Sequence, residues 1–198
     1  MMYDYHMLLG AAAVFLGVFG YGLYFRSIFL GITKPHFFTW LIYFLVDIIV
    51  FTAQVLNGAG AGSWVTLTGV VGTLSVALIA LRCGEKHITS SDWISFIAAL
   101  GAIVLWRTTD NALIAVVIAS VINFLAIAPT FRKSYSRPQE ESLSIWILDA
   151  VRFSLGIAAL GAVSFTTALF PTALVVGNLA LIAMIVLRRR QLAPPRGV

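Results

Sequence analysis

Charged residues are scarce in this sequence, and so are the residues that build reactive or metal-binding sites. Asp, Glu, Lys and Arg make up 11% of the 198 residues, whereas about a quarter of an ordinary soluble domain is charged. The single cysteine, Cys83, excludes an internal disulfide. The histidines His6, His36 and His87 have no metal-ligand spacing, and the sequence has no glycine-rich nucleotide loop and no Ser-His-Asp set. We therefore expect neither an enzyme nor a bound cofactor.

Apolar residues take the place of the missing charge. They make up 60% of the chain, and the mean hydropathy is +0.97. A helix needs about 17 to 25 mostly apolar residues to cross a bilayer, and most of the apolar runs here have that length. They predict an all-α membrane protein with seven transmembrane helices. The runs are Leu8 to Tyr24, Phe37 to Val55, Trp64 to Leu81, Ile88 to Trp106, Ala112 to Ala128, Leu143 to Leu160 and Thr166 to Leu187.

The basic residues predict how these helices are oriented. When the helix ends are assigned alternately to the two sides, Arg107 is the only basic residue on one side, and Arg152 lies inside a helix. The positive-inside rule then places the N-terminus outside and the C-terminus in the cytoplasm. The net charge of +5 is explained by this topology and by contact with lipid headgroups, so we expect membrane lipid as a partner and no nucleic acid. The basic residues on the predicted cytoplasmic side are Arg26, Lys34, Arg82, Lys86, Arg132, Lys133, Arg137, Arg188, Arg189, Arg190 and Arg196.

Two segments of the chain share one pattern. Phe25-Arg26 precedes Trp40 and Phe131-Arg132 precedes Trp146, with 15 residues from Phe to Trp in each case and an offset of 106 between the segments. The same offset maps the first three apolar runs onto the last three and leaves the fourth without a counterpart. Because the first unit has three spans and the linker adds one more, both units enter the membrane in the same direction. This predicts a parallel 3+1+3 repeat.

The repeat divides the chain into four parts. We expect a first three-helix bundle at residues 1–85, a linker helix at 86–110, a second three-helix bundle at 111–190 and a disordered tail at 191–198. Two similar bundles joined by a linker are typical of transporters whose site lies between the repeats.

The segment APTFRKSYSRPQEESLSIWILDAVR, from Ala128 to Arg152, resembles the PQ-loop motif of the SWEET and PQ-loop superfamily. The residues that match this motif in order are Pro129-Thr130, Arg132-Lys133, Ser142, Ser144 and Trp146. The first unit has Leu23-Tyr24 at the Pro-Gln position and keeps Trp40. The resemblance implies a seven-helix carrier of the 3+1+3 plan, which the PnuC vitamin transporters share. Asn178 resembles the helix-seven Asn that contacts sugar in SWEET transporters, but no Trp stands deep in the second or sixth run, so the sequence departs from a plain sugar site.

Three charged residues lie where a membrane span should be apolar. Asp47 stands about 17 Å along the second run, and Asp149 and Arg152 stand three residues apart on one face of the sixth. Charges at this depth cost about 2.5 to 3.5 kcal/mol each and therefore face the interior and pair. We expect the three to line a cavity, with Tyr43, which the offset places on Asp149. The alternative is a neutral cluster that only holds two helices together.

Amide and tryptophan side chains extend this candidate site. Asn123 and Asn178 lie in the fifth and seventh runs and Gln54 in the second, where they serve as ligand contacts or as hydrogen bonds between helices. For Trp146, an interfacial anchor is the alternative to stacking on a solute.

These features predict a small-solute transporter that works by alternating access between the two bundles. Arg152 suggests a polar or anionic solute, and a carboxylate is available to carry a coupling proton. We expect it in the bacterial inner membrane and include a homo-oligomer among its expected states. The alternative function on the same fold is a non-transporting membrane receptor or assembly subunit.

Overall fold

The structure is a computed structural model that describes residues 2–31, 35, 37–84, 90–109, 111–136, 138–140 and 143–192. In these ranges all the regular structure is helical, without a strand, which confirms the predicted all-α class for this part of the chain. The elements are α1 (Met2–Phe29), α2 (Phe37–Leu56), η1 (Gly60–Ser63), α3 (Trp64–Cys83), α4 (Ser90–Thr109), α5 (Ala112–Ser136), η2 (Pro138–Glu140), α6 (Leu143–Ala158) and α7 (Phe165–Leu192).

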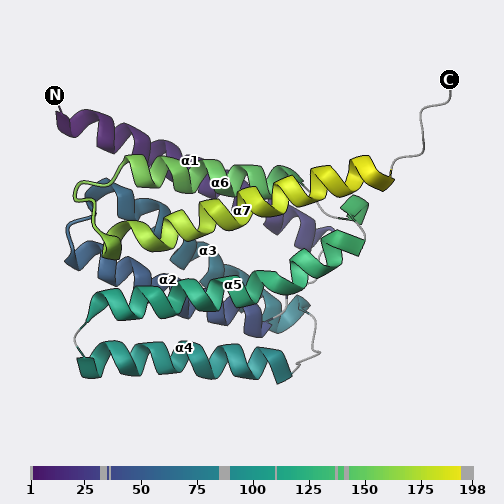
Figure 1. Cartoon of the computed structure of the whole chain (residues 1–198), viewed down its shortest axis with the longest axis horizontal. Helices are drawn as coiled ribbons and strands as arrows, with labels where there is room; N and C mark the ends of the chain where they lie inside the picture. The colour runs from purple at the N-terminus through teal and green to yellow at the C-terminus, as the bar shows by residue number, and fades with distance from the viewer. Residues whose placement is uncertain are drawn as a thin grey trace.

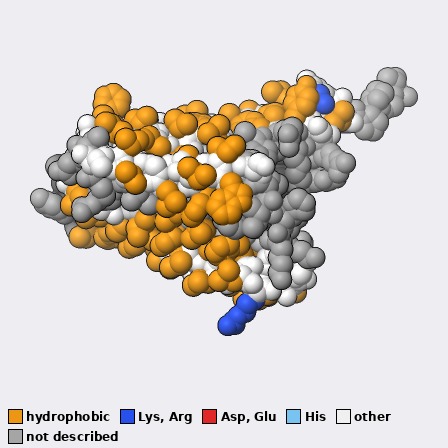
Figure 2. Space-filling view, turned by 90° about the horizontal axis from the view of Figure 1, so that it is seen from below, with side chains coloured by type: hydrophobic (Ala, Val, Ile, Leu, Met, Phe, Trp, Pro, Cys, Tyr) orange, Lys and Arg blue, Asp and Glu red, His pale blue; other side chains and the backbone are white. Residues whose placement is uncertain are grey.

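Several of these helices have the length and composition of membrane spans. Among the described residues, Tyr5–Phe29, Gly60–Cys83 and Phe165–Leu192 are long and apolar enough to cross a bilayer, and Trp40–Leu56 and Ala112–Leu125 are shorter apolar helices. Large hydrophobic side chains also lie exposed on the outside of the bundle (Figure 2). Such a surface is compatible with an integral membrane protein, because lipid tails are its natural solvent.

The helices extend beyond the apolar runs that predicted them. The helix α1 continues to Phe29, α5 continues past Pro129 to Ser136, and α7 continues to Leu192. Basic residues stand in the last turns of α1 and α7, where positive charge is favoured by the helix dipole. The runs that predicted α1 and α7 stop before these basic residues, but the helices do not. The first two residues of the predicted tail are therefore helical, and residues 193–198 lie outside the described part.

The helices form one bundle in which α3 packs against both α1 and α2, and α7 packs against both α5 and α6. The contacts between these two groups run mainly from α1 to α6 and from α2 to α5, while α4 lies at the edge of the bundle against α5 and α2 (Figure 1). The third helix of each group is thus central, and the two groups meet along their first and second helices.

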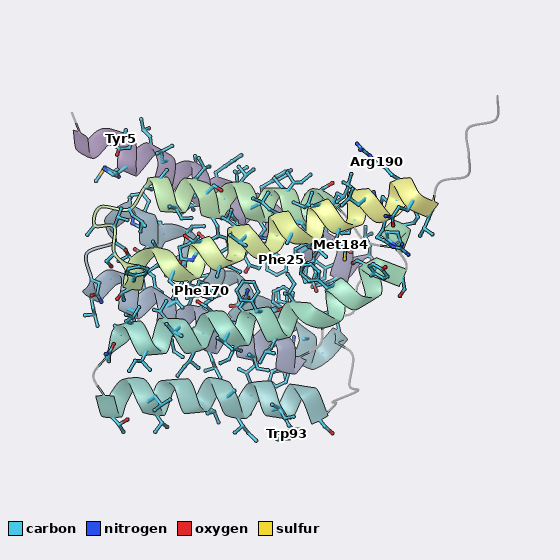
Figure 3. All side chains as sticks on the ribbon, in the orientation of Figure 1. Tyr5, Phe25, Trp93, Phe170, Met184 and Arg190 are labelled. Atoms are coloured by element: carbon cyan, nitrogen blue, oxygen red, sulfur yellow. The ribbon has the colours of Figure 1, made fainter. Side chains whose placement is uncertain are left out.

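Small and branched residues fill the contact between α2 and α5. Ile42, Val46, Ile49, Val50 and Ala53 follow the helical period on one face of α2 and meet Ala115, Val116, Ala119 and Ile122 of α5 in one buried cluster. Phe170 of α7 belongs to the same cluster and lies between α7 and α5 (Figure 3). The alanines let the backbones of the two helices approach closely.

Candidate functional site

A cavity of about 360 Å³ lies where the two helix groups meet. Its wall combines aromatic side chains with charged and amide groups, and every helix except α4 contributes to it. Among the lining residues are the predicted site residues Asp47, Asp149, Arg152, Asn178, Asn123 and Tyr43, together with Trp40 and Trp146. The structure thus brings these eight residues to one cavity.

Asp149, Arg152 and Asn178 form a hydrogen-bonded triad. Arg152 Nε donates to Asp149 Oδ1 at 2.6 Å, which is the ion pair that the i, i+3 spacing on α6 predicts. Asn178 Nδ2 on α7 donates to the other oxygen, Asp149 Oδ2, at 2.7 Å. Both carboxylate oxygens are therefore occupied, and the triad ties α6 to α7.

The guanidinium of Arg152 still has an unused donor. Its Nη1 is buried and has no hydrogen-bond partner, and only 11% of the side chain is exposed. The group lies 4.3 Å from the centroid of the Phe153 ring and 6.0 Å from that of Tyr21, so aromatic faces stabilise part of its charge. A Cβ at Gly17 of α1 would lie 3.6 Å from Nη1. The free donor is therefore next to α1, in the wall of the cavity.

Asp47 belongs to a second polar group, which α2 and α3 form. Its carboxylate packs against α3, where Thr73 Oγ1 donates to Asp47 Oδ2 at 3.4 Å, although that hydroxyl makes a shorter bond of 2.8 Å to the Gly69 carbonyl. Asp47 is 8% exposed, and within the described part of the chain no basic group lies within 4.0 Å of it.

The predicted three-residue cluster is therefore divided into two groups. Arg152 pairs with Asp149 because that partner lies one turn away on the same helix, whereas Asp47 comes from α2 and turns towards α3. Both groups line the same cavity. Among the described residues, the charged side chains of its wall are two carboxylates and one guanidinium.

The two repeated tryptophans lie in the aromatic wall near the beginnings of α2 and α6. The Trp40 ring lies 4.9 Å from the Tyr24 ring and 5.9 Å from the Tyr43 ring, centroid to centroid. Trp146 also lines the cavity. Each tryptophan thus lies in the cavity wall. Pro129 and Thr130 belong to α5, but their side chains lie outside the described part, as does the whole of Ser142.

Sequence reasoning missed Tyr21, Thr73 and Gly69 as parts of this site. Tyr21 and Thr73 are each one of several polar residues in their helices, and Gly69 is one of several small residues that also suit close helix packing. A Cβ at Gly69 would lie 2.8 Å from Asp47 Oδ2. Polar groups and a glycine inside predicted spans were the available signal, but only the packing of α2 on α3 shows which of them meet Asp47.

A second hollow, of about 620 Å³, opens between α1 and α3. Apolar side chains such as Val14, Val18, Leu67 and Val71 form most of its wall, and none of the described residues that line it is charged. It is larger than the first cavity, but its described wall has no charged or amide side chain. The candidate site is therefore the smaller cavity.

Comparison with known proteins finds no matching family model, no similar curated protein and no similar solved structure.

Proposed function

We propose that this chain is a small-solute membrane transporter that works by alternating access between two three-helix units, α1–α3 and α5–α7. The observation that carries the proposal is the 360 Å³ cavity between the units, with charged and amide groups in its wall. Charged groups inside a membrane protein are costly, and an interface that only joins helices is better served by apolar packing. The cavity therefore favours solute binding over a structural cluster.

The packing of the helices supports the 3+1+3 repeat. Exchanging the two units turns the contact of α1 with α6 into the contact of α5 with α2, and both contacts are present. In each unit the third helix is central. We propose seven spans with α4 as the linker, the N-terminus outside and the C-terminus in the cytoplasm of a bacterial inner-membrane protein. The resemblance to the SWEET and PQ-loop superfamily supports the same function.

The two polar groups have different proposed roles. The triad presents Arg152 Nη1, a donor without a partner, to a polar or anionic group of the solute. Asp47 lines the same cavity, with no paired cation among the described residues, and is the carboxylate proposed to carry a coupling proton. Its charged and titratable neighbours in the cavity wall are Tyr21 of α1, Tyr43 of α2, and Asp149 and Arg152 of α6.

A binding screen followed by uptake tests the proposal. Small polar solutes are screened for those that raise the melting temperature of the purified protein, because a ligand that binds only the folded state stabilises it. We expect the effect to be lost in Asp47→Asn and kept in Ser154→Ala, which removes a hydroxyl that bonds within α6 away from the cavity. A solute that passes this test should accumulate in vesicles that contain the parent protein. Binding without uptake would favour a receptor instead.

A further inference from the structure

One end of the bundle is closed by a seam between the two units. We define the seam as the contact of Gln54, Ala59 and Gly62 with Gly156, Gly161 and Thr167. The Gly161 amide donates to the Ala59 carbonyl at 2.9 Å, and Gln54 Nε2 donates to the Thr167 carbonyl at 2.9 Å. The first bond runs between the α6–α7 and α2–α3 connections and the second from α2 to α7, so both join the units directly.

The acceptor of the Gln54 bond depends on a proline. Pro171 stands inside α7, four residues after Thr167, and it has no amide hydrogen to donate to the Thr167 carbonyl. Gln54, which is fully buried, supplies the missing donor from the other unit. The bond that closes the seam is therefore made at the place where α7 is weakest as a helix.

Glycines bring the backbones together in the same seam. A Cβ at Gly62 would lie 2.8 Å from the Gly156 carbonyl oxygen and 2.8 Å from Leu160 Cα, both on the other unit. A Cβ at Gly156 would collide with the Val65 side chain. At Gly62 these close atoms are backbone, so a larger side chain there forces the units apart, while at Gly156 it requires Val65 to move.

One polar atom in the closed seam lacks a hydrogen-bond partner. Gln54 Oε1 is buried and has no hydrogen-bond partner. Burying such a group without a partner costs free energy, and a hydrogen bond to water would remove this cost. An apolar residue at this position would avoid that cost, but it would leave the Thr167 carbonyl without a donor. An unpaired acceptor instead lowers the cost of parting the units and admitting water.

At the opposite end, the described part of the cavity wall reaches the surface of the bundle. There its wall includes Leu23, Ser144 and Ile145, which are exposed. At the seam end the wall stops at Phe170 and Leu174, and none of the seam residues line it. We name the end that carries Trp40 and Trp146 the entrance.

We propose that the seam is a gate: the structure is the state with the seam closed and the entrance open, and α7 bends at Pro171 when the seam parts and the entrance closes. The inference rests on the proposed carrier function and adds which contacts hold this state. It explains why Pro171 and Gln54, far apart in the sequence, meet at one carbonyl group.

Spin-label distances test the gate without a solute. A seam pair at Leu56→Cys and Val163→Cys and an entrance pair at Leu30→Cys and Ile145→Cys use exposed positions, each in a Cys83→Ser background. The protein is placed in vesicles of phosphatidylethanolamine and phosphatidylglycerol. Gly62→Ala, which overpacks the closed seam, should raise the ratio of long to short seam distances roughly 5- to 150-fold. The same variant should raise the population of short entrance distances in step.

Two further variants complete the test. Gln54→Leu deletes the seam hydrogen bond and should shift both distances in the same sense, about 2- to 10-fold. If Gly62→Ala does not fold, Gln54→Leu alone tests the gate. Gly22→Ala is the control, because a Cβ there meets nothing within 4 Å, and it should leave both distributions unchanged.

The coupling of the two ends is the decisive result. A seam that lengthens with no change at the entrance, or a seam that does not respond to either variant, overturns the gate. Because the distances are measured without solute, solute uptake alongside an unresponsive seam would refute the gate and leave the carrier function standing. Coupled distances without uptake would support the gate and refute the carrier function.

Discussion

Gly69 leaves the space that the Asp47 carboxylate occupies. A Cβ at position 69 would lie 2.8 Å from Asp47 Oδ2 and 3.2 Å from its Cγ, so the charged group rests directly on the backbone of α3. This contact turns Asp47 towards α3 and away from a direct ion pair with Arg152. The effect of a substitution at Gly69 of α3 therefore depends on which residue stands at position 47 of α2.

Gly69→Ala should therefore displace the carboxylate. We expect this variant to lower the thermal stability of the protein in detergent, and Asp47→Ala combined with Gly69→Ala to recover part of the loss, because the smaller side chain removes the clash. Residues in contact show coupling free energies of about 0.5 to 3 kcal/mol. Gly22→Ala, on an open face of α1, is the matched control. Strictly additive effects of the two substitutions would contradict the contact.

Removing Arg152 should be costly. Arg152→Ala leaves Asp149 without its cation, and breaking one partner of a buried pair destabilises a protein by about 3 to 5 kcal/mol. Replacing both partners, as Asp149→Leu with Arg152→Met, removes both charges and should regain much of that stability. The measurement is the free energy of unfolding in detergent micelles. A double variant less stable than Arg152→Ala alone would show that the pair is not the reason for the loss.

Asp47→Asn separates function from stability. The substitution keeps the shape of the side chain and a hydrogen bond to Thr73 while it removes the charge, so we expect folding and melting temperature close to the parent. Solute uptake or its coupling to protons should be lost. Uptake and thermal melting are measured on the same preparations. If the variant melts like the parent and transports with the same pH dependence, Asp47 does not belong to the site.

Labelling of single cysteines tests the topology. Cys83 is exposed at the end of α3, and we expect a membrane-impermeant thiol reagent to reach it only from the cytoplasmic side. Val163, 76% exposed between α6 and α7, should be reached from outside in the variant Val163→Cys with Cys83→Ser. Intact cells and inverted vesicles provide the two sides. Labelling of Cys83 in intact cells would reverse the proposed orientation.

The length of the apolar runs predicted which segments are helices, because a bilayer-length apolar run has few other stable structures. It did not predict where the helices end, since α1, α5 and α7 continue beyond their apolar runs. The pair of Asp149 with Arg152 was predictable, because both residues lie on one helix face and need no tertiary contact to meet. The position of Asp47 was not, because it depends on how α2 packs against α3.

The sequence by itself determined the all-helical class, the charged residues that must face inward and the pairing of Asp149 with Arg152. These follow from local periodicity and from the cost of charge in an apolar solvent. Only the tertiary structure decided that Asp47 turns to Gly69 and Thr73, that Asn178 completes the triad, and that Gln54 meets the carbonyl freed by Pro171. Each of these contacts joins different helices, and the packing of helix on helix depends on the shape of whole faces, which no local pattern specifies.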